Sequence, residues 1–457
     1  MVRVLAVLLL GFVTANACAG DANFDVHEWG TFTVLQDERG RELPGINIDD
    51  EPVPEFVHDL APYLLTSPFI TGTHRGYQMK GAPRHHPAVT MRLETPVIYF
   101  HPHPGAKLPR KIEVQATFRG GWLTQFYPQA DFATPGYAPG KFDFRKLTPA
   151  TESTLTWRGL QIGTQDPGPE TTDPVWLSPR KVHALDVTNR DGESERYLFY
   201  RGVAQLRAPL RIELARDKQQ LTFYGNFAGV LKDRPTTLGD VWLVRVNERG
   251  QCAYRRLDAL EVDGRDDVPR LTTSYRFDDT SGADQKADLE REMHAALVKD
   301  GLHADEATAL LTTWQRAYFA SPGLRVFYLV PRAWTDHYLP LTITCKPATV
   351  RTMVGRIELI GDELRERLTR LSRTAPSAQK WLTQMPESPA KDAFFEGRSF
   401  HGDLGVEIPA DYKLYLSLGR FRNALVTAEE ARTKSTNLRA FVENYGLQPF
   451  RPGGEEK

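Results

Sequence analysis

The sequence predicts a mainly β protein with helical additions, an α+β fold built on an antiparallel β-sandwich-like body. Between residues 26 and 262, many short apolar stretches are separated by Gly, Pro, Asn and Asp. Two segments with helical periodicity follow this region, and the chain ends in a further helical stretch. Many short strands at close spacing, with almost no helical periodicity between them, are typical of sandwiches and barrels.

The clearest strand signals are two segments in which apolar and polar residues alternate, 111–118 and 210–214. This alternation is the period of a half-buried strand. Pro96 interrupts the run 90–100, and because proline cannot donate to a ladder we expect a bend or a sheet edge there. Further strands are predicted at residues 28–35, 122–127, 196–201, 221–224, 241–246, 324–330, 339–345 and 350–360.

A helical hairpin is predicted between residues 283 and 319. Leu289 and Met293 begin the apolar face of its first helix, which Gly301 closes. Glu306 stands three residues after His303, which is the spacing of a helix start signal, although histidine is a mediocre cap. We therefore expect two antiparallel helices joined by a short turn.

A chain of 457 residues is too long for one ordinary hydrophobic core. The segments above suggest a division into five parts. They are a signal peptide (1–19), a β-rich sandwich-like domain (20–270), a helical hairpin with returning strands packed on the β body (271–360), a helical C-terminal region (361–450) and a disordered tail (451–457).

The first residues have the pattern of an export signal. Arg3 precedes an unbroken apolar run at 4–13, and small residues follow at Ala15 and Ala17, as signal peptidase requires. The run is about half of the ~20 residues needed to span a bilayer, and no later segment is apolar enough to do so. The sequence thus predicts a periplasmic or extracellular protein. Lipidation of Cys18 is the less favoured alternative, because the Leu usual three residues earlier is missing.

Charge and cysteine content narrow the possible partners. The 57 Lys and Arg residues balance 58 Asp and Glu residues. A near-neutral chain argues against nucleic acid and against electrostatic binding to anionic lipid. Cys252 and Cys345 either form a disulfide in an oxidising compartment or remain two buried free thiols.

No familiar catalytic signature is present. The sequence lacks a His-Glu-x-x-His motif, a Gly-x-Ser-x-Gly elbow and a glycine-rich phosphate loop. Candidate chemistry therefore has to come from clusters of polar residues, and no cofactor can be identified from them.

The first cluster combines His27 and Glu28 with the acidic run Asp49, Asp50 and Glu51. Three consecutive carboxylates repel one another unless they are solvated, hydrogen-bonded or bound to a cation. Together with the histidine they suit an acid/base or metal centre. The alternative is a solvated acidic turn beside an edge strand, which charge runs usually form.

The second cluster is a group of histidines, His85, His86, His101 and His103. Imidazole is the commonest transition-metal ligand in proteins. Neighbouring prolines favour loops rather than a strand at these positions, and Glu94 is the only carboxylate that suggests itself as a further ligand. A metal site and a set of ordinary loop histidines both remain open.

The third cluster places Arg92 and Glu94 on one strand face, with Trp122 and Tyr127 on the strand that follows. A carboxylate, an arginine and aromatic rings on a sheet suit a carbohydrate or aromatic ligand. They equally suit a sandwich core that covers an ion pair.

The motif His-Glu-Trp-Gly-Thr-Phe-Thr at 27–33 resembles the opening motif of an uncharacterised family of exported bacterial proteins. The segments 47–54, 94–100 and 330–336 are similar to other blocks of that family. The resemblance extends over most of the chain after the leader. It implies a bacterial surface or periplasmic protein, and it implies no activity, cofactor or catalytic residue.

Two functions follow from these observations. The first is an exported β-sandwich binding or structural module of the cell envelope, which recognises a glycan or another envelope protein. The second is an extracytoplasmic hydrolase, with or without a metal ion, whose site is built from His27, Glu28 and the 49–51 run. A sandwich fold hosts both, so the geometry of the site has to decide between them.

Overall fold

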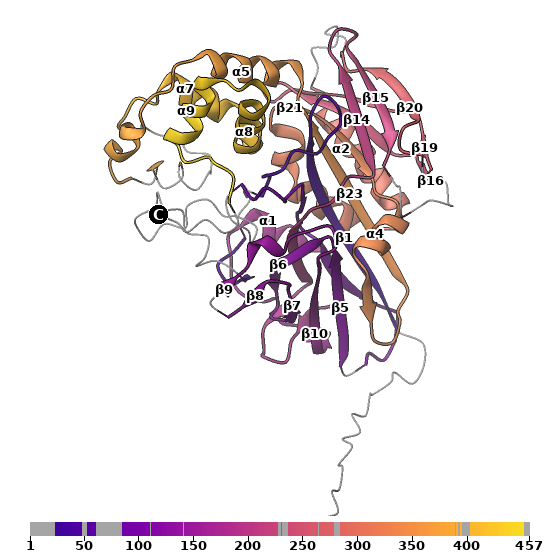
Figure 1. The fold of residues 1–457 in the computed structure, drawn as a ribbon. Coiled ribbons are helices and arrows are strands. Elements are labelled where there is room, and N and C mark those ends of the chain that lie inside the picture. The colour runs from indigo at the N-terminus through magenta and orange to yellow at the C-terminus, as the bar shows by residue number, and fades with distance from the viewer. Residues whose placement is uncertain are drawn as a thin grey trace, which may run out of the picture.

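The computed structural model describes residues 23–47, 53–60, 85–109, 111–139, 141–226, 230, 236–263, 265–277, 284–388, 390–391, 394 and 403–451. The predicted signal peptide and all of the predicted tail except Arg451 lie outside these residues. The described chain is a mixed α+β fold in which mostly antiparallel sheets form the body (Figure 1). Its C-terminal region is helical, so the fold class expected from the sequence is confirmed.

The largest sheet joins ten strands of the described chain. They are β1 (Phe24–Gln36), β2 (His58–Asp59), β3 (Met91–Leu93), β4 (Val97–Pro102), β6 (Gly121–Tyr127), β13 (Leu198–Ala204), β17 (Val241–Val246), β18 (Cys252–Arg256), β21 (Gly323–Leu329) and β23 (Thr349–Leu359). Their spatial order is β18–β17–β21–β23–β1–β3–β13–β6–β2, with β4 beside β1 and β13. Strands from the 20–270 and 271–360 segments therefore share one sheet.

Strand β1 lies in the middle of this sheet. It pairs in parallel with β23, from Val26 opposite Thr349 to Gln36 opposite Leu359, and antiparallel with β3 and β4. The parallel pair is the exception in a sheet whose other pairs are antiparallel. A Cβ atom on Gly30 would lie 2.8 Å from the Cα of Pro96, so the close approach of the chain at this bend requires glycine.

A second sheet packs against one face of the first. It contains β5 (Ile112–Arg119), β7 (Asp131–Ala133), β10 (Glu152–Ile162), β11 (Val187–Thr188), β12 (Ser194–Glu195) and β22 (Leu341–Ile343). Every second residue of β5 is buried, as its alternating sequence predicts. Apolar side chains of both sheets form one core between them, which is the expected sandwich arrangement.

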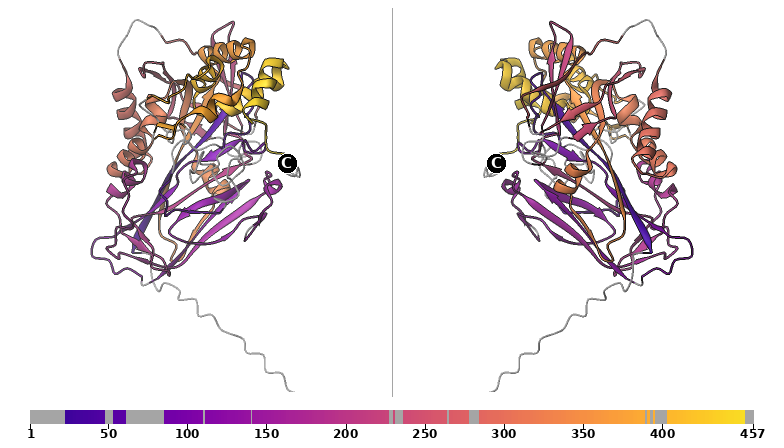
Figure 2. Two further views of the ribbon diagram at one scale, coloured as in Figure 1. Left: turned by 90° about the vertical axis from the view of Figure 1, so that its left-hand side faces the viewer. Right: turned by 90° about the vertical axis from the view of Figure 1, so that its right-hand side faces the viewer.

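The helical hairpin covers the opposite face of the large sheet. Helices α2 (Lys286–Lys299) and α3 (Ala304–Thr313) lie along that face, away from the second sheet (Figure 2). Leu289, Met293 and Leu310 pack in a core together with Trp29 and Tyr99 from β1 and β4. Gly301, with φ of 117°, ends the first helix as expected.

Smaller elements complete the body. A three-stranded sheet is formed by β14 (Leu210–Ala215), β15 (Gln220–Gly225) and β20 (Pro269–Ser274), and two-stranded pairs by β16 (Thr236–Leu238) with β19 (Leu260–Val262) and β8 (Tyr137–Ala138) with β9 (Lys141–Phe142). Short helices are α1 (Pro174–Leu177) and α4 (Arg332–Tyr338). The predicted strand at 90–100 is divided into β3 and β4 around Pro96, which confirms the expected bend.

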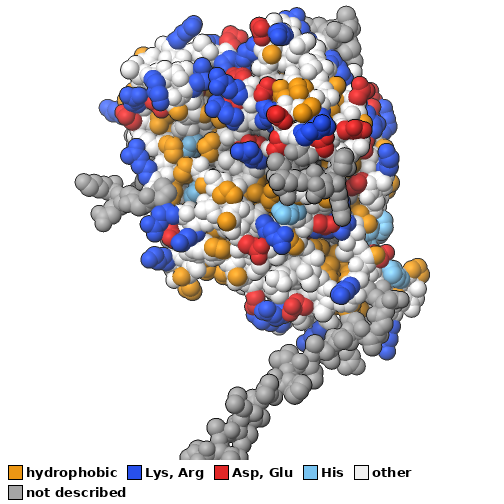
Figure 3. All heavy atoms as spheres, turned by 45° about the vertical axis from the view of Figure 1, so that its right-hand side comes forward, with side chains coloured by type: hydrophobic (Ala, Val, Ile, Leu, Met, Phe, Trp, Pro, Cys, Tyr) orange, Lys and Arg blue, Asp and Glu red, His pale blue; other side chains and the backbone are white. Residues whose placement is uncertain are grey.

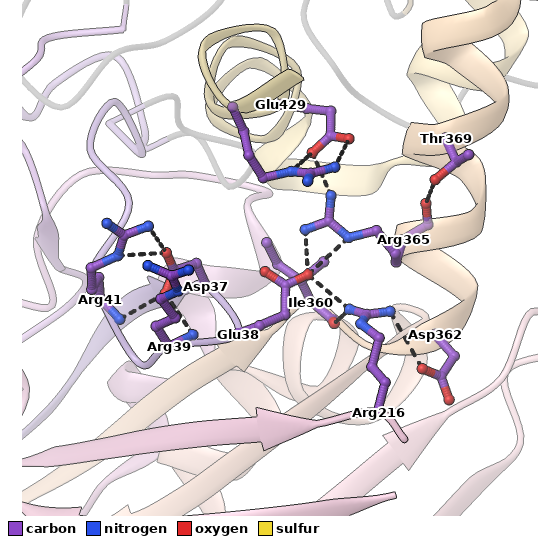
Figure 4. A network of polar contacts seen from close by, with 11 residues as sticks. Asp37, Glu38, Arg39, Arg41, Arg216, Ile360, Asp362, Arg365, Thr369 and Glu429 are labelled. Atoms are coloured by element: carbon purple, nitrogen blue, oxygen red, sulfur yellow. Dashed lines mark hydrogen bonds and ion pairs between the residues drawn. The ribbon is translucent and has the colours of Figure 1, made fainter. Parts of the chain in front are cut away.

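The C-terminal helices pack at one end of the large sheet around a core of their own. They are α5 (Asp362–Arg373), α7 (Ala410–Ser417), α8 (Arg422–Thr433) and α9 (Thr436–Asn444). Glu38, just after β1, accepts hydrogen bonds from Arg216 (2.9 Å) and from Nε of Arg365 (2.8 Å) on α5. Arg365 also pairs with Glu429 on α8, so one network joins these helices to the body (Figure 4).

Three further expectations concern charge, thiols and membrane spans. Basic and acidic side chains are interspersed on the face shown in Figure 3, in keeping with a balanced chain. Cys252 is a buried free thiol, whereas Cys345 is disulfide-bonded, so neither the predicted Cys252–Cys345 disulfide nor the alternative of two free thiols is correct. Burial raises the pKa of the Cys252 thiol to about 11. In the described part of the chain, no helix has the length and apolar character needed to cross a bilayer.

Candidate metal centre

Four potential metal ligands meet at the interface between the large sheet and the helical hairpin. They are His27 on β1, His101 on β4, and His303 and Glu306 at the start of α3, and we call them the His–Glu centre. Their ligand atoms all lie within 4.8 Å of one another. Among the residues that the structure describes, no second group of three or more His, Cys, Asp and Glu side chains is close enough to share one ion.

Strand pairing places the two sheet histidines together. Residue 25 lies opposite His101, and His27 lies opposite Tyr99, so His27 and His101 are diagonal neighbours on one face. Such neighbours are within reach of large side chains. The centroids of the two rings are 4.5 Å apart, and the ring of His303 lies 4.6 Å from His27 and 4.5 Å from His101.

Glu306 is the residue to which the others connect. Its Oε2 lies 2.7 Å from Nδ1 of His27 and accepts a hydrogen bond of 2.7 Å from the backbone N–H of His303. Its Oε1 lies 3.1 Å from Nε2 of His101. The bond to His303 is half of a capping box, so the same geometry that starts α3 also aims the carboxylate at the two imidazoles.

The electrostatics keep the carboxylate ionised. Burial of Glu306 raises its pKa, but the hydrogen bonds from His101 and His27 outweigh this and lower the pKa to about 2. The N-terminal end of α3 also favours a negative charge at this position. Burial and the neighbouring imidazoles lower the pKa of His303 below its ordinary value, which favours the neutral form with a free lone pair.

The centre is buried on three sides and reaches solvent on the fourth. Glu306 is fully buried and His27 and His101 are nearly so, whereas the side chain of His303 is 53% exposed. Asp305, the neighbour of Glu306 on α3, pairs with the exposed His183 at 2.8 Å. The exposed imidazole of His303 therefore marks the side on which the centre is open to solvent.

Glu28 does not belong to this centre. Adjacent residues of a strand point to opposite faces, so His27 faces the helical hairpin while Glu28 faces the sandwich core. There the Glu28 carboxylate, 0% exposed, forms an ion pair of 2.5 Å with Nε of Arg351 and accepts a hydrogen bond from Tyr200. The structure thus separates the two residues that the sequence analysis had combined. Asp49, Asp50 and Glu51 lie outside the described residues.

The second predicted cluster is also divided. His101 is part of the His–Glu centre. His85 forms a hydrogen bond with the Thr427 hydroxyl (3.0 Å), and His86 forms one with the backbone oxygen of Phe144 (2.7 Å). His103 forms an exposed pair of 3.1 Å with Asp25. Burial lowers the pKa of His86, so this ring is a neutral hydrogen-bonding side chain beneath the C-terminal region.

Arg92 and Glu94 are brought together, as a buried ion pair of 3.2 Å. Both side chains are at most 1% exposed, and Arg420 lies 3.8 Å from the other oxygen of Glu94. The C-terminal region covers this pair, since Arg92 lies over the ring of Phe421. Glu94 is therefore engaged with arginines and does not serve the histidines as a ligand.

Trp122 and Tyr127 pack inside the molecule rather than on its surface. Trp122 is 0% exposed, contacts Phe142 and donates a hydrogen bond of 3.0 Å to the backbone oxygen of Pro135. Tyr127 is 3% exposed and packs against Phe56. Burial raises the pKa of the Tyr127 hydroxyl. These rings form no exposed shelf, so they give a glycan no surface to stack on.

Sequence reasoning missed His303 and Glu306 as ligands and interpreted their spacing only as a helix start. The signal was nevertheless present. A His and a carboxylate three positions apart in the first helical turn lie on one face, as paired metal ligands do. What no pattern in the sequence indicated was which strands this turn would meet.

Comparisons with known proteins leave the chain without an assigned family. No family model and no curated protein matches the sequence. Among solved structures, the Fcho1 mu-homology domain of Danio rerio with a bound Eps15 peptide matches with a TM-score of 0.27 and 9% identity, covering 74% of this chain and 96% of that one.

The yeast delta-COP-I mu-homology domain matches too. Complexed with a Dsl1 WxWxV peptide it gives a TM-score of 0.23 at 8% identity, and without peptide 0.23 at 9%. In both cases the match covers 74% of this chain and 97% of the other. At such TM-scores the superpositions carry no argument about function.

Proposed function

We propose that this protein is an exported metal-binding module whose His–Glu centre holds Zn²⁺ or a related first-row transition ion. One observation carries the proposal: four ligand atoms from β1, β4 and α3 lie within 4.8 Å of one another, and three of the four side chains are buried. The binding module expected from the sequence thereby takes a narrower form, in which the ligand is a metal ion.

The donor set favours a transition metal over calcium or magnesium. Three imidazole nitrogens and one carboxylate oxygen suit Zn²⁺, Cu²⁺ or Ni²⁺, whereas Ca²⁺ and Mg²⁺ prefer shells of oxygen ligands. Imidazoles bind a metal as neutral ligands, so the Glu306 carboxylate would supply the single negative charge of the ligand set. A divalent cation would neutralise that charge and replace the hydrogen bonds that now join His27 and His101 to Glu306.

Only small movements are needed to bind an ion. In a tetrahedral zinc site with bonds of about 2.0–2.1 Å, the ligand atoms are about 3.3 Å apart. The His27–Glu306 contact of 2.7 Å would lengthen slightly, and the 3.9 Å separation between Nδ1 of His303 and Glu306 would shorten. His303 is the most exposed of the four and is free to make the larger adjustment.

The location of the protein is part of the proposal. The charged and apolar leader at 1–19 and the resemblance to exported bacterial proteins support a periplasmic or extracellular site of action.

The metal proposal is tested by titrating tag-free protein, first treated with EDTA and dialysed, with Zn²⁺ in a calorimeter. We expect one ion per chain and a raised melting temperature, since a ligand at 100 times its Kd stabilises by about 2.7 kcal/mol. Repeating the titration with Ca²⁺ should give no comparable heat. Absence of zinc binding, or the same affinity for Ca²⁺, would contradict the proposal.

A metal-dependent hydrolase is the second candidate, favoured by the exposure of His303. If His27, His101 and Glu306 alone hold the ion, the fourth position belongs to water, as in catalytic zinc sites. Co²⁺-substituted protein separates the cases. A bound water that loses its proton changes the visible spectrum between about pH 6 and 9, whereas four protein ligands give a spectrum that stays constant over that range.

A further inference from the structure

A large cavity lies where the C-terminal helices meet the large sheet, apart from the His–Glu centre. Its volume is about 1240 Å³, and its walls come from β21, β23, α5, α7 and the turn at Gly419–Phe421. This volume exceeds that of most small-molecule sites, so the cavity accommodates more than a single ion.

The walls of the cavity carry an excess of positive charge. Eight Lys and Arg residues line it, against four Asp and Glu residues. The molecule as a whole is nearly neutral, with 57 basic and 58 acidic residues, so this excess is local. Charged walls of one sign concentrate ligands of the opposite sign.

The strongest concentration of charge is at the buried end. Arg325 and Arg356 have side chains only 1% exposed, and both pair with Glu358, at 3.0 Å from Nε of Arg325 and 2.6 Å from Nε of Arg356. Arg420 is a third guanidinium close enough to lower the pKa of the same carboxylate. Glu358 thus lies among three guanidinium groups, of which Arg420 also lies 3.8 Å from Glu94. Burial and the neighbouring guanidinium groups lower the pKa of Arg325 to about 10.

One N–H group of the Arg356 guanidinium lacks a hydrogen-bond partner in the described structure. The remaining N–H groups of Arg325 donate to backbone oxygens of residues 317, 318 and 321. By contrast, Nη1 of Arg356 is buried and has no hydrogen-bond partner in the described structure, although the residue lines the cavity. A buried charged donor without an acceptor costs free energy, which an anion in the cavity would recover.

We infer that this cavity binds a small molecule carrying a tetrahedral oxyanion, a phosphate or sulfate group, seated against Arg356 and Arg420. Guanidinium groups match the oxygens of such anions in charge and in planar, bidentate geometry. The exposed Arg276 and Arg370 line the same cavity and attract further negative charge from solvent. The size of the cavity indicates that the anionic group belongs to a larger molecule or to a condensed phosphate.

The test is calorimetry of the full protein in EDTA, so that no ion at the His–Glu centre takes part. The probes are sulfate, inorganic phosphate, pyrophosphate and ribose 5-phosphate. We expect the phosphate compounds to bind, most tightly those with more than one anionic or hydrogen-bonding group. Preference for pyrophosphate would indicate an inorganic ligand and preference for ribose 5-phosphate an organic ester. Lack of binding by all four at millimolar concentration would overturn the inference.

Two variants and a control locate the binding. Arg356→Gln should weaken the tightest probe at least about tenfold, because a charged hydrogen bond is lost. The double variant Arg276→Gln/Arg370→Gln changes only exposed side chains, so it remains folded, and it should weaken binding about threefold or more. Arg291→Gln, on α2 with a side chain 72% exposed and outside the cavity, should bind as the parent does. Equal affinity in all variants would refute the site.

Discussion

Replacing Glu28 by alanine is expected to lower the free energy of unfolding by about 3–5 kcal/mol, because it leaves the guanidinium of Arg351 buried without its main partner. The Glu28 carboxylate is 0% exposed and lies 2.5 Å from Nε of Arg351. The second carboxylate near Arg351, that of Asp336, is 48% exposed and compensates only in part. Urea unfolding followed by circular dichroism measures the change through its midpoint.

The control for this variant is Glu113→Ala. Glu113 lies on β5, is half exposed and forms an ion pair with Arg158. It should cost less than about 1 kcal/mol, as surface ion pairs do. Zinc affinity should be unchanged in Glu28→Ala, since Glu28 points away from the His–Glu centre. Loss of zinc binding with full stability would show that Glu28 acts at the metal and would contradict this assignment.

Replacing Glu306 by glutamine is expected to reduce zinc affinity at least about 100-fold. Loss of a direct ligand should cost at least as much as the largest losses caused by changing the residues that hold ligands in place. The change removes the only carboxylate of the centre while a carbonyl oxygen remains to accept from the His303 backbone N–H. The start of α3 should therefore persist. Calorimetric titration with Zn²⁺ measures the affinity, and circular dichroism checks the fold.

Glu193→Gln is the matched control for Glu306. Glu193 also lies beside a histidine, 2.8 Å from Nε2 of His58, but that pair is not part of a group able to hold an ion. We expect parent-like zinc affinity in this variant. If Glu306→Gln bound zinc as tightly as the parent, the His–Glu centre would be a hydrogen-bonded cluster and no metal site.

Much of the fold could be predicted because it depends on local periodicity. Alternation in β5, the bend at Pro96 and the turn at Gly301 each follow from the conformational preferences of a few neighbouring residues. The parallel pairing of β1 with β23 could not be predicted in this way. It joins residues more than 300 positions apart, and no local pattern specifies such a partner.

The site was only half predictable for the same reason. His27 and His101 were both selected, but in different clusters, because their proximity depends on the register of β1 against β4. Glu28 was grouped with His27 because the two are adjacent in sequence, although a period of two sends them to opposite faces. Glu306 appeared only as a capping residue, because its partners lie on strands some 200 and 280 residues earlier.

The seven-residue motif at 27–33 is now explained in structural terms. His27 serves the centre, Glu28 the buried ion pair with Arg351, and Trp29 the core beneath the helical hairpin. Gly30 allows the close approach of Pro96. One strand thus contributes a residue of the His–Glu centre, a buried ion-pair residue, a core residue and a glycine at a close backbone approach. This combination explains the order of residues in the motif, which neither composition nor alternation alone would predict.

The position of β1 between β4 and β23 also determines the order of assembly. During synthesis, β1 is made long before β23, so it lacks its neighbour on that side until residue 359 has followed. The large sheet therefore cannot close on a partial chain, and its contacts of long sequence separation make late, slow folding the expected behaviour. The core of this sheet is therefore complete only after most of the polypeptide has been synthesised.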